Sequence, residues 1–291
     1  MSRYPAMFAA LKERGEGAFI PFVMVGDPDP ATSEAVIEAL IAGGADALEL
    51  GVPFTDPVAD GPTIQKAHVR ALAAGAGFRD CLEVVTRVRR RHPQTPIGML
   101  IYGNVPFAMG LEHFYTECAQ AGIDSVLLPD VPIRESALFS RAAEEAGIDA
   151  VYIAPPSAAT ETLDAVAAAS RGYVYAVSRV GVTGTERASS TVGLAESVER
   201  LRADAAAPVM LGFGISTPEQ VSEAIAAGAD GAISGSATVK IVERYAPEIV
   251  ATASASSDGT GNEERRHYAL GALRSDLVAF TATMKEATRQ H

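Results

Sequence analysis

A short pattern that recurs four times constrains the fold of this chain most. Each copy holds a glycine, one further residue, an aspartate and then a run of apolar, β-prone residues. The copies are Gly44–Leu50, Gly122–Leu128, Gly147–Ile153 and Gly228–Ser234. Glycine supplies the left-handed residue that ends a helix, and the run after the aspartate is too short to continue one. Each copy therefore predicts a helix end followed by a β-strand.

Four further strands are predicted between these copies, and helical patterns separate all eight. The additional strands are Ala18–Val25, Pro96–Ile101, Tyr173–Val177 and Pro208–Leu211. The helical patterns are Ala31–Ala42, Thr63–Ala74, Cys81–Arg91, Leu111–Ala121, Ile133–Ala146, Thr160–Ser170, Leu194–Ala203 and Thr217–Ala227, with another start at Ser236. Eight strand and helix alternations predict an α/β protein, one (βα)8 TIM barrel over residues 1–291, with its chemistry on the loops that follow the strands.

Extra segments lie towards the two ends. Tyr4–Gly15 is predicted to form an amphipathic helix that plugs the amino-terminal mouth of the barrel. Residues 251–262 are small and polar, which predicts a flexible insertion, and residues 263–289 resume a helical pattern. We therefore expect an extra amino-terminal helix, and extra helices near the ends of the last strands and near the carboxyl terminus.

Composition excludes several classes of function. Hydrophobic residues make up 48% of the chain, and no run reaches the roughly 18 consecutive apolar residues of a membrane span. The formal charge of −12 argues against nonspecific binding to nucleic acid or anionic membranes. Residues 1–17 show no apolar core of signal-peptide length, so the cytoplasm is the expected location. Cys81 and Cys118 have no CxxC spacing and are expected to be buried.

The histidines and lysines predict no metal centre and no covalent nucleophile. The five histidines occupy helical patterns, a helix end and the tail, without metal-ligand or Ser-His-Asp spacing. Every lysine falls in a helical pattern, so a Schiff-base aldolase mechanism has no strand-end amine. Proton transfer by carboxylates is therefore the chemistry that we expect.

Three carboxylates mark the loop after the second strand, within Leu48–Gly61. Glu49 stands between two leucines, an expensive place for a charge unless it is used. Asp60 returns from the loop to face it, and Asp56 lies between them. Burial among apolar side chains, including Leu50, is expected to raise the pKa of Glu49 towards neutrality.

Other strand ends supply candidate pocket residues. Leu100 and Tyr102 either line a pocket or pack in the core. Tyr175 shares strand parity with Tyr173, so both are expected to point inward. Residues 178–190 are polar and contain two glycines, so we expect a long loop that acts as a mobile lid.

The last two strands end in glycine-bearing loops that predict a phosphate site. Gly212–Gly214 follows the seventh strand, and Gly235-Ser236 follows the eighth. Glycine lets backbone N–H groups approach an anion, and Ser236 can cap the next helix. The residues together indicate carboxylate chemistry on a phosphorylated substrate with an apolar body.

Leu48–Gly61 resembles the signature of the tryptophan synthase alpha-chain family. The similarity continues in Phe19–Phe22, Ser178–Gly184, Gly212–Ser216 and Ser234–Ala237, so it spans essentially the whole barrel. The resemblance implies a lyase that cleaves indole-3-glycerol phosphate to indole and glyceraldehyde 3-phosphate by a retro-aldol reaction. It implies no cofactor in this chain.

The resemblance also assigns roles to residues. Glu49 would be the general acid and base, Asp60 would bind the indole N–H, and Tyr175 would assist near the glycerol. Thr183 would bond Asp60 when the lid, which carries Arg179, closes. The phosphate would be held by Gly184, Phe213, Gly214, Gly235 and Ser236, and the indole by Phe22, Leu100, Tyr102, Leu127, Tyr175 and Ile233.

A partner is implied as well. The family works as an α2β2 complex in which indole passes through a tunnel to a beta chain that holds pyridoxal phosphate. Asp56, Pro57 and Asn104 are the expected contact residues on loops at the same mouth. For Asp56, a purely local role in stabilising its turn stays open.

Two other classes of function compete with this interpretation. A noncatalytic subunit that only activates a beta chain would not need both Glu49 and Asp60. A phosphosugar isomerase or epimerase would need more polar pocket walls than a bicyclic ring does. Within the favoured class, a stand-alone lyase that releases indole stays open.

Overall fold

The computed structural model describes residues 2–155, 158–177, 194–204, 207–254 and 259–289. Eight strands form a closed barrel in which each strand pairs in parallel with the next and β8 pairs with β1. The strands are β1 Ala18–Met24, β2 Leu48–Gly51, β3 Ile97–Leu100, β4 Ser125–Leu127, β5 Asp149–Ala154, β6 Val174–Val177, β7 Val209–Gly212 and β8 Gly231–Ser234. The predicted (βα)8 barrel is confirmed.

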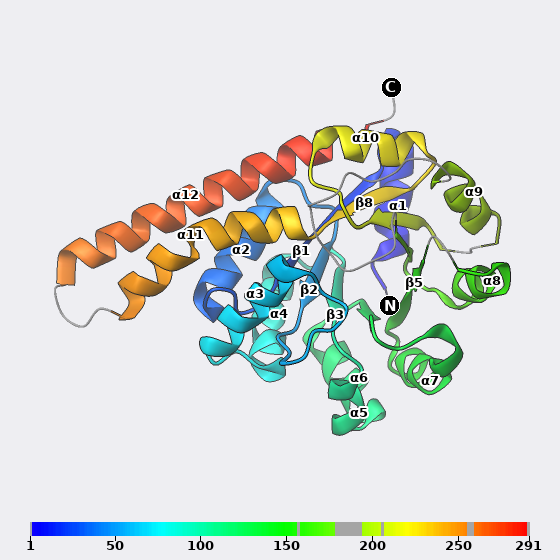
Figure 1. Cartoon of the computed structure of the whole chain (residues 1–291), viewed down its shortest axis with the longest axis horizontal. Helices are drawn as coiled ribbons and strands as arrows, with labels where there is room; N and C mark the ends of the chain where they lie inside the picture. Colours follow the sequence, from blue (N-terminus) through cyan, green and yellow to red (C-terminus); the bar gives the residue numbers. More distant parts are fainter. Residues whose placement is uncertain (1, 156–157, 178–193, 205–206, 255–258, 290–291) are drawn as a thin grey trace.

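Helices surround the barrel (Figure 1). They are α1 Tyr4–Arg14, α2 Pro30–Ala42, α3 Pro62–Ala73, α4 Phe78–Arg91, α5 Asn104–Met109, α6 Leu111–Ala121, α7 Ala137–Ala146, α8 Thr160–Ala169, α9 Leu194–Asp204, α10 Pro218–Ala226, α11 Ser236–Ser254 and α12 Gly259–Glu286, with a 3₁₀ turn, η1 Ile133–Glu135. None of the described helices is both long enough and apolar enough to cross a membrane.

The glycine and the aspartate of the recurring pattern have separate structural roles. All four glycines have positive φ, namely 95° at Gly44, 89° at Gly122, 72° at Gly147 and 92° at Gly228. In three copies the aspartate accepts a backbone N–H at the start of the preceding strand, at 2.8 Å: Asp46 from Phe19, Asp124 from Ile97 and Asp230 from Val209. The pattern thus ends a helix and fastens the beginning of a neighbouring strand.

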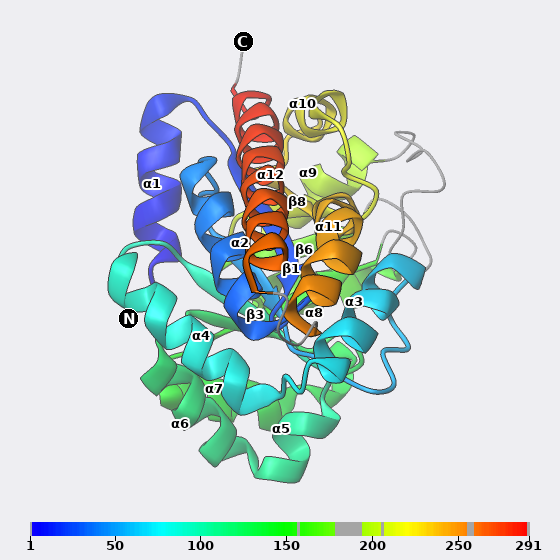
Figure 2. The same cartoon turned by 90° about the vertical axis from the view of Figure 1, so that its left-hand side faces the viewer.

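Helix α1 supplies side chains to the barrel interior. Tyr4 is 1% exposed, and its hydroxyl lies 3.0 Å from Ser125 Oγ. Its ring meets Tyr173 edge to face at a centroid distance of 5.4 Å. Leu11 joins the same buried cluster. Figure 2 shows α1 beside the barrel, as expected for a helix that covers its amino-terminal mouth.

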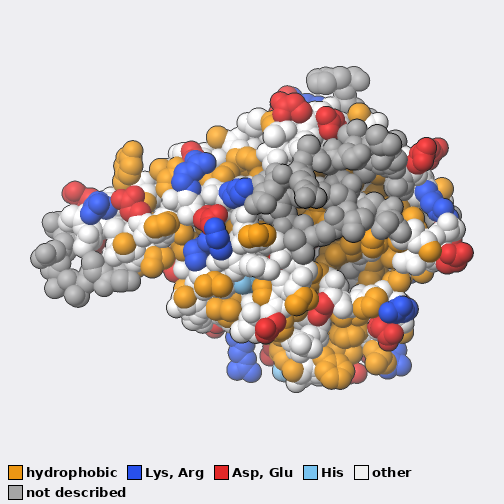
Figure 3. Space-filling model, in the orientation of Figure 1, with side chains coloured by type: hydrophobic (Ala, Val, Ile, Leu, Met, Phe, Trp, Pro, Cys, Tyr) orange, Lys and Arg blue, Asp and Glu red, His pale blue; other side chains and the backbone are white. Residues whose placement is uncertain are grey.

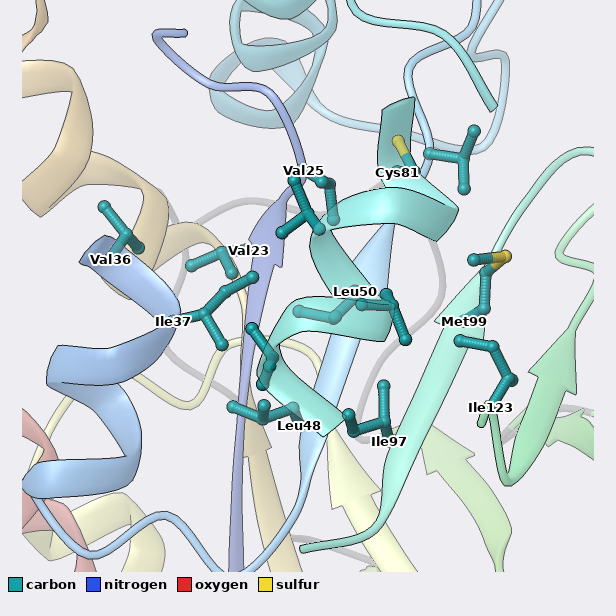
Figure 4. Packing of buried hydrophobic residues seen from close by; sticks show 14 of the residues in the cluster. Val23, Val25, Val36, Ile37, Leu48, Leu50, Cys81, Ile97, Met99 and Ile123 are labelled. Atoms are coloured by element: carbon teal, nitrogen blue, oxygen red, sulfur yellow. The ribbon is translucent and has the colours of Figure 1, made fainter. Parts of the chain in front are cut away.

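A separate apolar layer lies between the strands and the outer helices. Leu48 and Leu50 of β2 pack there with side chains such as Ile37 and Cys81 (Figure 4). Burial of each large aliphatic side chain contributes about 1.5–3 kcal/mol, so this layer stabilises the strands that carry the site. Because successive strand residues face opposite sides, Glu49 between the two leucines faces the barrel interior.

The carboxyl-terminal segment is more helical than its composition predicts. Helix α11 runs to Ser254 and α12 begins at Gly259, so only residues 255–258 of the expected 251–262 insertion lie outside the described residues. Alanine has high helix propensity, and α11 and α12 pack along each other, which outweighs the small-polar composition. Both helices extend away from the barrel together (Figure 1).

Two further elements differ from the sequence prediction. Ile133–Ala146 was predicted as one helix, but η1 and α7 divide it at Ser136. Asn104 was predicted on a loop, but it begins α5. Proline disfavours the interior of a helix, but Pro106 lies in the first turn of α5. The N–H groups of a first turn have no acceptor within the helix, so the N–H that proline lacks costs no hydrogen bond there.

Candidate active site

A pocket opens at the carboxyl ends of the strands, and most of its walls are apolar. Two carboxylates, Glu49 and Asp60, are its acidic members. Its lining comprises Phe22, Glu49, Ala59, Asp60, Ile64, Leu100, Leu127, Pro129, Ile153, Tyr175, Phe213, Gly214, Ile215, Gly235 and Ser236. An apolar cavity with a few convergent polar groups is the usual form of a small-molecule site.

Glu49 lies inside the barrel and is 2% exposed. The Tyr173 hydroxyl donates a hydrogen bond of 2.9 Å to Glu49 Oε1. Burial raises the pKa of Glu49 to about 7, against the opposing effect of the Tyr173 hydrogen bond and with a further increase from the charge of Asp60. Near neutral pH this carboxyl therefore exchanges between its protonated and ionised forms.

The apolar surroundings of Glu49 differ in one residue from those expected. Leu50 was predicted beside the carboxyl, but it packs in the outer layer against the helices. Phe22, Leu100 and Leu127 do share the pocket with Glu49. The period of two along a strand explains the difference, because adjacent residues cannot face the same side.

Asp60 is held by a tyrosine whose hydroxyl direction is fixed. Tyr102 donates to Asp60 Oδ2 at 2.7 Å, and its oxygen accepts the Ala59 backbone N–H at 3.1 Å. Burial, followed by the charge of Asp60, raises the pKa of Tyr102. The phenol therefore stays protonated and serves as a permanent donor to the carboxylate.

His68 is a site residue that the sequence analysis missed. This α3 side chain is 1% exposed, and its Nε2 lies 3.1 Å from Asp60 Oδ2. A signal was available, since Ile64, Ala67, His68 and Ala71 are the buried residues of α3 and follow helical spacing. The helix begins directly after the Asp60 loop, so its inward face lies against that loop.

Tyr175 and Tyr173 both face the interior, as their shared parity predicted. Burial, followed by the charges of Glu49 and Asp60, raises the pKa of Tyr175. The ring of Tyr175 lies 6.0 Å from that of Phe213, between centroids. A Cβ at Gly212 would fall 2.3 Å from the Tyr175 hydroxyl oxygen, so glycine is required for this approach.

The rim beyond the apolar walls is suited to an anion. Phe213 and Gly214 have φ of 61° and 79°, and positive φ at a nonglycine residue is strained and concentrates at ligand sites. Ser236 begins the 19-residue helix α11, whose first hydrogen bond runs from Val239 N to Gly235 O. The first N–H groups of such a helix, and its dipole, favour a phosphate.

The remaining predicted residues are distributed as follows. Tyr102 and Ile233 do not line the pocket; Tyr102 donates a hydrogen bond to Asp60, and Ile233 packs in the barrel interior. Asp56 and Pro57 line a separate groove, which His68 also lines. Arg179, Thr183 and Gly184 on the expected lid lie outside the described residues. Ala59, Ile64, Pro129, Ile153 and Ile215 are lining residues that were not predicted.

Comparison with known proteins identifies the family. A sequence model described as tryptophan synthase alpha chain matches residues 8–266. The tryptophan synthase alpha chain of Corynebacterium efficiens is 53% identical over 290 residues, covering 100% of both chains. That of Klebsiella pneumoniae is 54% identical over 248 residues, which cover 85% of this chain and 92% of the relative.

Solved structures of tryptophan synthase chains are similar to this chain as well. A chain of Mycobacterium tuberculosis tryptophan synthase is 30% identical, with a TM-score of 0.83 and coverage of 100% of this chain and 99% of that chain. Tryptophan synthase subunit alpha of Legionella pneumophila is 29% identical, with a TM-score of 0.79 and coverage of 99% and 98%. With the family match over most of its length and full-length relatives above half identity, this chain belongs to the tryptophan synthase alpha chain family.

Proposed function

We propose that this chain cleaves indole-3-glycerol phosphate to indole and glyceraldehyde 3-phosphate. Family membership supports this reaction, and one observation of the site carries it: two carboxylates, Glu49 and Asp60, share an apolar pocket whose rim is built from glycine-bearing loops and a helix start. The walls suit an indole ring, the rim suits a phosphate, and the acids suit the proton transfers between them.

Glu49 moves the protons of the retro-aldol step. Indole carbon 3 must gain a proton, and the adjacent hydroxyl of the glycerol chain must lose one as the carbon-carbon bond breaks and a carbonyl forms. A carboxyl with a pKa of about 7 can both donate and accept near neutral pH. Its burial beside Tyr173 holds it in one orientation. The reaction balances without water and without a cofactor.

Asp60 stabilises the charge that this protonation creates. When carbon 3 of indole is protonated, the ring nitrogen becomes positive, and an adjacent carboxylate lowers the energy of that intermediate. Tyr102 holds Asp60 by Oδ2. In this proposal Oδ1 accepts the indole N–H. Tyr175, inside the same pocket, lies towards the glycerol chain and assists its orientation.

The partner in this proposal is a tryptophan synthase beta chain in an α2β2 assembly. Asp56 and Pro57 line a groove that also includes Val58 and Val69, which are 75% and 66% exposed. Phe107 of α5 is 70% exposed. Figure 3 shows hydrophobic side chains on the face of the molecule that carries α3 and α5. Contiguous exposed apolar surface marks interaction sites, and in this proposal these side chains contribute to such a surface. Pyridoxal phosphate would belong to the beta chain, and the cytoplasmic location stays a prediction.

The direct test is release of indole by the purified chain. Incubation with indole-3-glycerol phosphate should yield indole and glyceraldehyde 3-phosphate in equal amounts, and addition of a beta chain should increase the rate. A subunit that only activates its partner would release none. An isomerase of sugar phosphates would instead convert a substrate without an indole ring, which this apolar pocket is not expected to bind.

Gly212→Ala should impair the reaction, because the new methyl group would collide with Tyr175. Overpacking of this kind displaces side chains, and we expect kcat/KM to fall about tenfold or more as the phenol shifts into the substrate pocket. Gly271→Ala on α12 is the matched control, since its added Cβ would point into open space. Steady-state kinetics that show equal kcat/KM for both variants would refute the assigned contact.

A further inference from the structure

His68 joins two parts of the site through its two ring nitrogens. Nδ1 lies 2.9 Å from the Phe54 backbone nitrogen, which donates to it. Nε2 lies 3.1 Å from Asp60 Oδ2. The imidazole also lines the groove formed by the Asp56 loop. One side chain therefore lies between the carboxylate in the pocket and the loop that we assign to the partner surface.

The two hydrogen bonds fix the tautomer of the ring. A backbone amide can only donate, so Nδ1 must carry a lone pair where it receives the Phe54 N–H. The proton of a neutral imidazole then resides on Nε2, which donates it to Asp60. An ionised Asp60 can only accept hydrogen bonds. The two hydrogen bonds therefore have one direction: Phe54 donates to His68, and His68 donates to Asp60.

His68 and Tyr102 together hold Asp60. Both donate to the same oxygen, Oδ2, from different elements of the fold. The ring of Tyr102 meets His68 edge to face at 6.2 Å and stacks on Phe54 at 5.0 Å, between centroids. Two donors at one oxygen restrict both the position and the rotation of the carboxylate, which its role at the indole nitrogen requires.

We infer that His68 is a positioning residue, which sets the orientation of Asp60 by donating from Nε2 while the Phe54 loop holds its Nδ1. The inference rests on the proposed function, in which Asp60 stabilises the charged indole intermediate. It gives a role to a residue that would otherwise only fill space on the buried face of α3.

Three substitutions separate this role from simple packing. His68→Asn keeps an oxygen near the place of Nδ1 for the Phe54 N–H, but it is too short to donate to Asp60. His68→Gln places an amide N–H near the position of Nε2 and keeps that donor. His68→Phe fills the volume with neither bond. We expect kcat to fall about tenfold in the Asn and Phe variants, with a smaller change in KM, and to stay within about threefold of wild type in the Gln variant.

A double-mutant cycle locates the effect at Asp60. In an Asp60→Asn background, His68→Asn should cost less than about twofold in kcat, because the group on which it acts has already lost its charge. A Phe variant with wild-type kcat, or a loss that is undiminished by Asp60→Asn, would overturn the inference. Failure of the wild-type chain to release indole would instead overturn the proposed function.

A measurement without turnover keeps the inference testable in either case. The ¹⁵N chemical shifts of the His68 ring in the wild-type protein at neutral pH should show a protonated Nε2 and an unprotonated Nδ1. Asp60→Asn should change the Nε2 resonance more than the Nδ1 resonance. A ring protonated on Nδ1 would contradict the assigned direction of both hydrogen bonds.

Discussion

Glu49→Gln should lower indole release by about 10²-fold to 10⁴-fold, the range expected when a general acid and base is removed. The amide has nearly the same shape as the carboxyl, and its oxygen can still accept the Tyr173 hydroxyl proton. What it loses is the ability to give and take a proton at a pKa of about 7. Steady-state assays should show the loss in kcat, with KM little changed.

The fold should tolerate this substitution, and the pH dependence of stability shows why. Because folding raises the pKa of Glu49 from 4.5 to about 7, the folded state binds the carboxyl proton more tightly than the unfolded state does. The contribution of this proton to the free energy of unfolding is complete below pH 4.5 and is lost as the pH rises through 7. At pH 8 the Gln variant should be at least as stable as wild type. Glu223→Gln, at an exposed position on α10, is the matched control for activity. If Glu49→Gln retained half the wild-type kcat, the acid-base role would be wrong.

Asp60→Asn should lower kcat by about 10²-fold, since a neutral amide stabilises a developing positive charge far less than a carboxylate does. The variant keeps an oxygen that can accept from Tyr102 and His68, so the loop should keep its conformation. The effect should appear mainly in kcat, because the charge on the indole nitrogen develops only in the course of the reaction.

A crystal structure of Asp60→Asn together with its kinetics would separate the two possible losses. The account requires an unchanged side-chain position and a lowered kcat. A raised KM with an unchanged kcat would mean that Asp60 only binds the substrate. A rotated side chain would mean that the substitution changes the geometry of the site as well as its charge.

The sequence was sufficient for the barrel and for most of the pocket because both depend on local periodicity. The four glycine and aspartate patterns mark strand starts, and a closed parallel barrel brings all strand ends to one face. Glu49 and Asp60 could therefore be placed together from one strand and its loop. The inward direction of Tyr175 followed from strand parity in the same way.

What the sequence did not reveal depends on contacts between elements. His68 has the spacing of an ordinary buried helix residue, and only the path of the Phe54 loop brings a donor to its second nitrogen. The α5 helix and the helical ends of residues 251–262 depend on tertiary packing, which overrides a local proline or a small-polar composition. Leu50 does not share the surroundings of Glu49, because adjacent residues of a strand face opposite sides of the sheet.

The central claim is that burial in the barrel raises the pKa of Glu49 to about 7, so that protonated and ionised forms of the carboxyl coexist at neutral pH. Titration of Glu49 by ¹³C NMR tests it most directly, with the protein labelled at glutamate side-chain carboxyls and the resonance identified by its absence from the Glu49→Gln spectrum. The account predicts a midpoint near pH 7, with the protonated form below it. A midpoint near the ordinary value of 4.5 would show that the pocket does not desolvate Glu49, and would contradict the account.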